Sequence, residues 1–175
     1  TTLKTRLSEA SLTAKELSRQ IEASMIVDTI VCIDGCDIIG AFLAEELTRA
    51  GIYSRNAHKT IYIITPEYSS AGQMLFRDNY LQMIKGKNIL LLLASATTGR
   101  TVTKAVQTLT YYGASISGIS AVFSAANSVM GIPVHALFTT ADVPDYKTYS
   151  PESCAMCKEN KPIDAFANAF GYSMI

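Results

Sequence analysis

The sequence contains few charged residues and no surplus of either sign. Charged residues make up 17% of the 175-residue chain, and 15 basic residues balance 15 acidic ones to a formal net charge of +0. No segment gathers Lys and Arg into a cluster, so the sequence gives no electrostatic support to nucleic-acid or anionic-membrane binding. We expect no partner of either kind.

Long apolar runs are missing as well. The longest run of large apolar residues, Ile89 to Leu93, is far shorter than a membrane-spanning helix requires. The segment from Thr1 to Glu9 carries charges and contains no apolar signal-peptide core. These two absences predict a cytoplasmic protein that does not cross a membrane.

Cysteine is scarce, and its residues fall into two close pairs. Cys32 and Cys36 lie in one segment, and Cys154 and Cys157 form a C-x-x-C. In a reducing compartment, free thiols or metal ligands are favoured over disulfides for such pairs. One C-x-x-C supplies half of a four-ligand zinc site, and a dimer partner or the first pair are the alternatives for the other half. We predict free thiols and no bound metal.

The sequence does contain a clear strand, loop and helix pattern that begins at Gly86. Ile89 to Leu93 are uniformly apolar, as in a strand that is covered on both faces. Small and hydroxyl-bearing residues follow, and apolar residues then recur at helical spacing from Val102 to Leu109. A tight loop that leads into a helix N-terminus presents backbone N–H groups and the positive end of the helix dipole to an anion. The pattern predicts a phosphate-binding loop.

The stretch GKNILLLLASATTGRT, residues 86–101, resembles the phosphoribosyl pyrophosphate signature of the type I phosphoribosyltransferases. That signature consists of an apolar strand, two acids and a T-T-G-G-T-like loop. Arg100 replaces a glycine that is common in the loop, and it either clamps a phosphate or points to solvent. The resemblance implies that the loop holds the 5′-phosphate of a ribose ligand through Ser95, Ala96, Thr97, Thr98, Gly99, Arg100 and Thr101.

The two acids of the signature are absent, because Leu93 and Ala94 stand at their positions. In the family this pair is associated with the ribose hydroxyls and the metal-bound pyrophosphate. The resemblance therefore implies that phosphate binding is retained and that the catalytic half is weakened. Asp34 or Asp37 could supply a substitute carboxylate. A variant with Asp at positions 93 and 94 is the test of whether the missing acids limit turnover.

A second strand, loop and helix pattern runs from Asp28 to Gly51, with Gly51 predicted to end the helix. It resembles the pyrophosphate loop of the same family, followed by a G-x-x-L-A helix start at residues 40–44. Asp37 is either a ligand-facing residue or the N-cap of the helix. The residues of this predicted pyrophosphate loop are Asp34, Gly35, Cys36 and Asp37.

Two further segments carry candidate contacts. Lys59 precedes a predicted strand at 60–64, where the family often places basic residues that meet pyrophosphate, and a solvated side chain is the alternative. The segment from Pro66 to Lys85 is predicted to be a flexible turn followed by a short helix at 73–84. The resemblance implies a mobile loop that closes over the site with Arg77 as a contact, and a surface helical hairpin is the alternative.

The rest of the chain fits a doubly wound, mostly parallel α/β sheet with ligands at the carboxyl ends of its strands. Residues 3–21 are predicted to form one amphipathic helix, or two that are broken near Ser11. We expect this segment to pack on the sheet or on the C-terminal part, and a dimer-forming arm is the alternative. A helix at 101–112 is predicted to end at Gly113, with strands at 116–124 and 134–139. We predict one domain over 1–175, with a core at about 25–140 and a small hood at about 141–175 whose apolar end caps the ligand edge.

The resemblance implies a function in nucleotide chemistry. It implies transfer of a phosphoribosyl group between phosphoribosyl pyrophosphate and a nucleobase, with Mg²⁺ on the pyrophosphate, in a homodimer. Orotate phosphoribosyltransferases are the members that the chain resembles most. Loss of the acidic pair favours an alternative, a non-catalytic sensor of a nucleotide or of phosphoribosyl pyrophosphate. A purely structural dimer partner is the third possibility.

Overall fold

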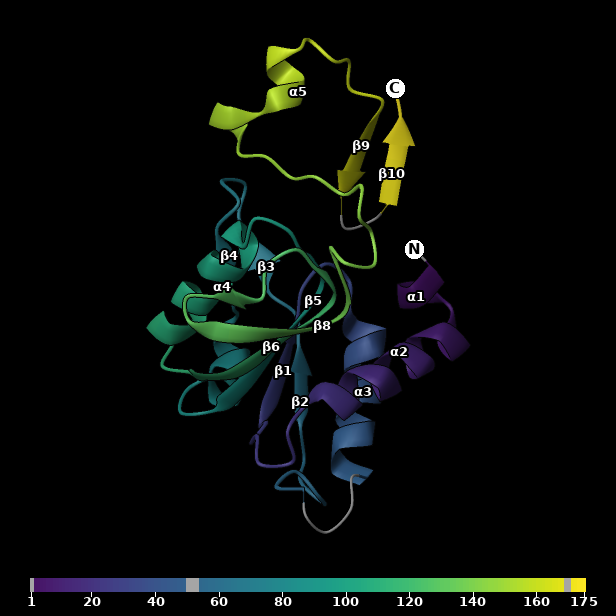
Figure 1. Cartoon of the computed structure of the whole chain (residues 1–175). Helices are drawn as coiled ribbons and strands as arrows, with labels where there is room; N and C mark the ends of the chain where they lie inside the picture. Colours follow the sequence, from purple (N-terminus) through teal and green to yellow (C-terminus); the bar gives the residue numbers. More distant parts are fainter. Residues whose placement is uncertain (1, 50–53, 169–170) are drawn as a thin grey trace.

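The central sheet has the predicted doubly wound, mostly parallel α/β arrangement (Figure 1). The computed structural model describes residues 2–49, 54–168 and 171–175. All neighbouring strands of the sheet are parallel except the last pair, which is antiparallel. In spatial order the strands are β2 (Tyr62–Ile64), β1 (Thr29–Cys32), β5 (Asn88–Ala96), β6 (Ser115–Ser124), β8 (Ile132–Thr139) and β7 (Ser128–Val129).

The order of the strands determines where a ligand can bind. The chain runs from β1 outward to β2 and then returns to β5, which pairs with the other side of β1. The connections that leave the carboxyl ends of β1 and β5 therefore diverge, and in open α/β sheets the crevice between such connections is the usual ligand site. Both loops that the sequence singles out begin at this crevice.

The apolar run in β5 is explained by burial on both faces of the sheet. Leu91 and Leu93 pack on the side of helix α4 (Arg100–Tyr111), whereas Leu90 and Leu92 pack on the side of helices α2 (Leu7–Gln20) and α3 (Asp37–Arg49). All of these leucines are fully buried. Because burying one leucine side chain contributes roughly 1.5–3 kcal/mol, β5 is the centre of the core.

The N-terminal helices pack on the chain's own core. α1 (Thr2–Thr5) and α2 lie against α3, and α2 also contacts β8 and β6. Ala10, Ala14 and Leu17 of α2 are fully buried in this contact. This part of α2 packs on the core, as expected for packing on the sheet, whereas Leu7 and Leu12 of the same helix are exposed. Among the described residues, no helix is long and apolar enough to cross a membrane.

The segment between β2 and β5 differs from the predicted turn and helix. β3 (Glu67–Tyr68) and β4 (Met74–Leu75) form an antiparallel hairpin, and a 3₁₀ helix, η1 (Asp78–Met83), follows it. Met74 and Phe76 are buried while Leu75 between them is exposed. This two-residue alternation is that of a strand, so the predicted helix at 73–84 is wrong in its first half.

The connection from β6 to β8 contains no helix, contrary to the expected alternation of strands and helices. The chain turns back through the short strand β7, which pairs antiparallel with β8. Met130 and Gly131 form the turn, both with positive φ (53° and 78°), as a two-residue hairpin turn of the primed type requires. The crossover is made by this extended segment.

Helix α4 ends as predicted. Gly113 has φ 84° and donates its N–H to Thr110 O at 2.9 Å, while Ala114 N–H reaches Leu109 O at 3.0 Å. These two bonds are the Schellman pattern, which uses a glycine in the left-handed region. Gly51, the predicted end of α3, lies outside the described residues.

The C-terminal segment lies above the carboxyl ends of the strands (Figure 1). The expectation that its apolar end packs as a cap is wrong, because Phe166, Tyr172 and Ile175 are 67%, 75% and 73% exposed. The hairpin places these side chains where no other part of the described chain covers them. Phe170 lies outside the described residues. The elements here are η2 (Pro151–Ser153), α5 (Ala155–Lys158), β9 (Ala165–Asn168) and β10 (Gly171–Met174).

Candidate functional site

The β1 loop, residues 33–36, makes a sharp turn at the carboxyl end of β1. Asp34 and Gly35 both have positive φ, 60° and 70°. The Cys36 carbonyl accepts the N–H of Gly40 at 2.8 Å, the first bond of α3, so Cys36 occupies the N-cap position. A Cβ at Gly40 would collide with Cys32 Sγ. Gly40 therefore allows α3 to start close to β1, which sets the position of the loop.

Asp34 is half-buried at the mouth of the crevice, with Lys4 of α1 beside it. Lys4 Nζ donates to the backbone carbonyl of Asp34 at 2.6 Å. Burial raises the pKa of the Asp34 carboxyl above its ordinary value, and the nearby Lys4 charge partly opposes this rise. The pair joins the N-terminus of the chain to the β1 loop, and it offers one cation and one acid to a ligand.

The other two polar residues of the predicted pyrophosphate loop face elsewhere. Asp37 is exposed in the first turn of α3, where its Oδ1 accepts the hydroxyl of Thr65 at the end of β2. It is therefore not the N-cap of α3. Cys36 is fully buried against α3, and burial raises the pKa of its thiol to about 12. The expectation that Cys36 faces a ligand is not met.

The β5 loop, residues 97–99, leads into the N-terminus of α4 as predicted. Gly99 has φ 72°, and a Cβ there would lie 3.2 Å from Val129 Cγ2, so both conformation and space favour glycine. Ala125 N–H donates to Ala96 O at 2.8 Å and ties the start of the loop to the end of β6. A helix leaves its first N–H groups without intrahelical partners, so the start of α4 offers donors to an anion.

The positions of the two missing acids lie on opposite faces of β5. Leu93 is fully buried on the α4 side, whereas Ala94 is half-buried and lines a cavity on the other side. A carboxylate at position 93 would therefore enter the core, and only one at position 94 would reach a ligand. The variant that tests whether the missing acids limit turnover should therefore carry Asp at position 94 alone.

One cavity at the carboxyl edge, of ≈ 460 Å³, brings the two loops together. We call it the edge cavity. It receives residues from both termini, from both loops and from the end of β6. Its lining consists of Leu3, Lys4, Asp34, Ala94, Ser95, Thr97, Thr101, Val122, Phe123 and Gly171.

The phosphate-loop residues divide between the edge cavity and a second hollow at the start of α4. Ser95, Thr97 and Thr101 line the edge cavity. The second hollow has ≈ 520 Å³ and is lined by Thr98, Arg100, Thr101, Thr103 and Lys104. Thr101 borders both, so the N-terminal turn of α4 separates two neighbouring positions for an anion. Ala96, the last residue of β5, and Gly99 of the β5 loop are buried.

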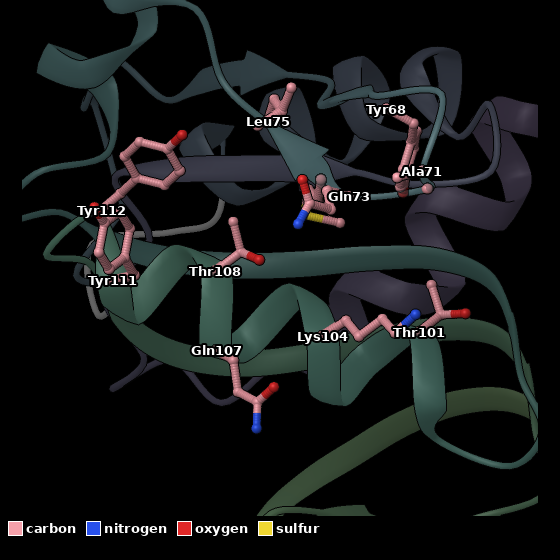
Figure 2. A pocket seen from close by; sticks show the side chains of 12 residues that line it. Tyr68, Ala71, Gln73, Leu75, Thr101, Lys104, Gln107, Thr108, Tyr111 and Tyr112 are labelled. Carbon is pink, nitrogen blue, oxygen red and sulfur yellow. The ribbon is translucent and has the colours of Figure 1, made fainter.

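A larger cavity, of ≈ 810 Å³, lies between the β3–β4 hairpin and α4. Figure 2 shows Gln73 from the hairpin side and Thr108 from α4 pointing toward one another across it, with Lys104 extending toward Thr101. None of the described residues that line it is acidic, and of the predicted site residues it includes Thr101. We therefore take the edge cavity as the candidate site.

Two predicted contacts are not brought to the edge cavity. Lys59 precedes β2, whose first residue pairs with Thr29 at the start of β1, so it lies at the amino edge of the sheet. Arg77 follows the hairpin and makes a two-bond ion pair with Glu67, at 2.6 and 2.7 Å, on the surface. Neither residue lines the edge cavity.

Sequence reasoning missed the edge-cavity residues that come from distant elements. Lys4 is 30 positions from the carbonyl that it contacts, and no local pattern indicates this. Phe123 lies at the carboxyl end of strand β6. Its ring contacts the ring of Tyr146 in the C-terminal segment, with 4.9 Å between the ring centroids. The carboxyl-end rule could have identified Phe123, because it applies to every strand of a parallel sheet.

No protein-family model and no curated protein matches the sequence. Several solved structures are similar in fold. Leishmania donovani UMP synthase aligns at a TM-score of 0.59 with 16% identity, over 81% of this chain and 29% of that one. The chain thus spans less than a third of that protein.

Two further structures align over most of both chains. Mycobacterium tuberculosis orotate phosphoribosyltransferase in complex with inorganic phosphate gives a TM-score of 0.55 with 14% identity, over 81% of this chain and 76% of that one. A hypothetical protein from Neisseria gonorrhoeae with bound ppGpp gives 0.50 with 16% identity, over 87% and 89%. With the sheet order, the divergent loops and the edge cavity, these likenesses lead to one conclusion: the chain has the fold of the type I phosphoribosyltransferases.

Proposed function

We propose that the chain binds a ribose-5-phosphate ligand in the edge cavity and transfers a phosphoribosyl group between phosphoribosyl pyrophosphate and a nucleobase such as orotate. The observation that carries this proposal is the convergence of three groups in one cavity. Thr97 of the β5 loop and Thr101 of the first turn of α4 form the anion site, Asp34 comes from the β1 loop, and Lys4 comes from α1. An anion site, a carboxylate and a cation are what a ligand with a phosphate and a pyrophosphate requires.

The 5′-phosphate is assigned to the start of α4. Backbone N–H groups and the positive end of the helix dipole favour an anion there, and the hydroxyl of Thr101 adds a donor. This part of the site depends little on charged side chains. The phosphate in the Mycobacterium tuberculosis neighbour is consistent with anion binding by this fold.

The pyrophosphate is assigned to the β1 loop, beside Lys4. Mg²⁺ usually keeps several waters and is held by one or two carboxylates together with substrate phosphates. Asp34 is the acidic residue that lines the edge cavity, so the residues fit an ion that arrives on the pyrophosphate and contacts Asp34. When bound, the ion would neutralise charge on the leaving pyrophosphate. Lys4 would share that task.

The base is assigned to the apolar part of the edge cavity. Leu3, Val122 and Phe123 line that part, and an aromatic ring offers a surface on which a planar base can pack. Catalysis in such a site is a matter of holding the base nitrogen and the anomeric carbon in line. The N-terminus and the end of β6 would do this holding.

A second candidate function is a sensor that binds its ligand without turnover. Ala94 supplies no carboxylate where the family has one, and Leu93 is turned into the core. The similar fold of the Neisseria gonorrhoeae protein with bound ppGpp favours a guanosine nucleotide that carries pyrophosphate groups as the ligand in that case.

A ligand panel and a turnover assay separate the two functions. Thermal stability is measured with inorganic phosphate, phosphoribosyl pyrophosphate, nucleoside monophosphates and ppGpp, each with and without Mg²⁺. Pyrophosphate release is then measured with orotate and with purine bases. Stabilisation with release supports the transferase, and stabilisation without release supports the sensor. No stabilisation by any phosphate compound would contradict both.

The Ala94→Asp variant sharpens this assay. It restores a carboxylate on the cavity side of β5 without changing the core. If the missing acid limits the reaction, turnover should rise, since one transition-state contact commonly changes a rate by on the order of a hundredfold.

The proposal also includes a homodimer in the cytoplasm. Light scattering on the purified chain measures the oligomeric state directly.

A further inference from the structure

The two cysteine pairs lie in opposite environments. Cys32 and Cys36 are fully buried between β1 and α3, and burial raises the pKa of both thiols. Cys157 is exposed and Cys154 is half-buried, both at α5 in the C-terminal segment. Thiol–disulfide exchange requires a thiolate that a second sulfur can approach. The C-terminal pair meets this requirement, and the buried pair does not.

The turn at α5 gives the two C-terminal thiols different roles. Cys157 N–H donates to Cys154 Sγ at 3.4 Å. Two backbone bonds, from Lys158 N–H to Cys154 O at 3.2 Å and from Glu159 N–H to Ala155 O at 3.0 Å, close the turn that carries both residues. The amide donor favours the thiolate of Cys154 and lowers its pKa, while the contact with Cys154 raises the pKa of Cys157.

A metal ion is a poorer fit to this turn. Structural zinc sites use four ligands. Across residues 2–49, 54–168 and 171–175, no group of three or more His, Cys, Asp or Glu side chains could hold a metal ion. The pair has two sulfur atoms on one turn, with an amide donor on Cys154 Sγ and Cys157 exposed beside it, and these features suit thiol–disulfide exchange better than metal binding.

We propose that Cys154 and Cys157 form a thiol–disulfide exchange site whose substrates are low-molecular-weight disulfides. The Cys154 thiolate attacks one sulfur of the disulfide, so a mixed disulfide forms, the original S–S bond breaks, and the second sulfur leaves as a thiolate. Cys157 then gives up its proton and attacks Cys154 Sγ, which expels the remaining thiolate. The two cysteines lose two electrons and two protons, and the external disulfide gains them as two thiols. This site is independent of the edge cavity.

The test uses the reduced full chain and glutathione disulfide at neutral pH. Peptide mass mapping should find a bond between Cys154 and Cys157, while the peptides of Cys32 and Cys36 stay reduced. The Cys157→Ser variant should stop with one glutathione attached to Cys154. The Cys154→Ser variant should react at least about tenfold more slowly, because it lacks the attacking thiolate. Both residues lie near the surface, so these variants should fold.

Three outcomes would overturn the proposal. The first is equal reaction rates for the two serine variants, which would remove the distinction between attacking and resolving thiols. The second is a chain that forms no bond between Cys154 and Cys157 under conditions that oxidise a reference dithiol. The third is stoichiometric zinc in protein purified without added metal, released only on denaturation.

Discussion

The β1 loop and the β5 loop lie at the same edge of one sheet and present different chemical groups to the edge cavity. The β5 loop offers backbone N–H groups and hydroxyls, and its lining residues carry no charge. The β1 loop offers the carboxylate of Asp34, with Lys4 beside it. Backbone donors survive most substitutions, whereas a carboxylate acts only where its side chain reaches the ligand. The phosphate half of the signature is accordingly retained while its acidic half is replaced.

The sharpest way to break this comparison is to return the acids to β5. Leu93→Asp should lower the free energy of unfolding by roughly 4 kcal/mol or more, because it removes a fully buried leucine and buries a carboxylate without a partner. Ala94→Asp, one residue further on, should lower it by no more than about 1 kcal/mol, because that side chain borders the edge cavity. Urea denaturation of both variants provides the measurement.

Similar losses for these two variants would mean that positions 93 and 94 do not differ in burial as described. The transferase interpretation would then need a different account of position 94. A chain with Leu93→Asp that folds normally would show that the crevice extends into what we describe as core.

The conformation of the β5 loop provides the second test. Gly99→Ala should destabilise the protein by about 1–2 kcal/mol for the left-handed conformation alone, and further through the contact with Val129 at 3.2 Å. Gly72→Ala in the β3–β4 turn is the matched control, because its φ is 73° against 72° and nothing lies within 4 Å of its Cβ. The difference between the two variants isolates the contact.

Phosphate affinity is the second measurement on these variants. Gly99→Ala should also shift the loop and so weaken inorganic phosphate binding about tenfold, which corresponds to a loss of about 1.4 kcal/mol in binding free energy. Gly72→Ala should leave it unchanged. Equal affinities would place the anion away from the β5 loop.

The fold could be predicted from the sequence where the residues of one element determine its burial or its end by themselves. The apolar run at 89–93 requires cover on both faces, and Gly113 ends α4 by local geometry. The hairpin at 67–75 was missed because two-residue strands are too short to display a period. Ser69 to Gly72 is a turn in both interpretations, so the error concerned Met74 and Phe76, whose alternating burial is a tertiary effect.

The candidate site could be predicted in part for the same reason. Its two loops follow strands that the sequence marks clearly. The contribution of Lys4 could not be foreseen, because the packing of α1 and α2 against α3 brings it to Asp34. The exposed C-terminal hairpin illustrates the converse case. Its apolar residues predict burial from the sequence, but they are exposed because no other part of the described chain covers them.

Lys4 offers a third test, of moderate size. Lys4→Met should weaken pyrophosphate binding roughly tenfold while preserving the apolar stem, since hydrogen bonds to charged groups contribute about 1.5–3 kcal/mol. Lys15→Met, on the exposed side of α2, is the control and should bind as the unaltered chain does. Isothermal titration of pyrophosphate with Mg²⁺ gives both values. Identical affinities would assign the pyrophosphate to another surface.

The smallest expected effect concerns the two ends of β1, where acids should respond to pH with opposite signs. Burial raises the pKa of Asp34 above its ordinary 3.8, so the native state holds this proton longer than the unfolded chain does. Stability from this group therefore falls as pH rises from 3.8 through the raised pKa. Asp34→Asn removes that fall, and the free energy of unfolding of the variant relative to the unaltered chain should increase over this range.

Asp28, just before β1, is the control with the reverse sign. Burial alone would raise its pKa, but hydrogen bonds from the backbone and side chain of Asn88, at 2.9 and 2.7 Å, lower it below 3.8. Its contribution is complete above pH 3.8 and is lost as pH falls through the lowered pKa. Asp28→Asn should thus lower the free energy of unfolding by the same amount at every pH above 3.8. The difference in free energy of unfolding between Asp34→Asn and the unaltered chain should instead change with pH as the pH rises from 3.8. A flat difference for Asp34→Asn would show that the carboxylate at the carboxyl end is as well solvated as a surface acid, and the edge cavity would lose the partly desolvated acid on which the pyrophosphate assignment depends.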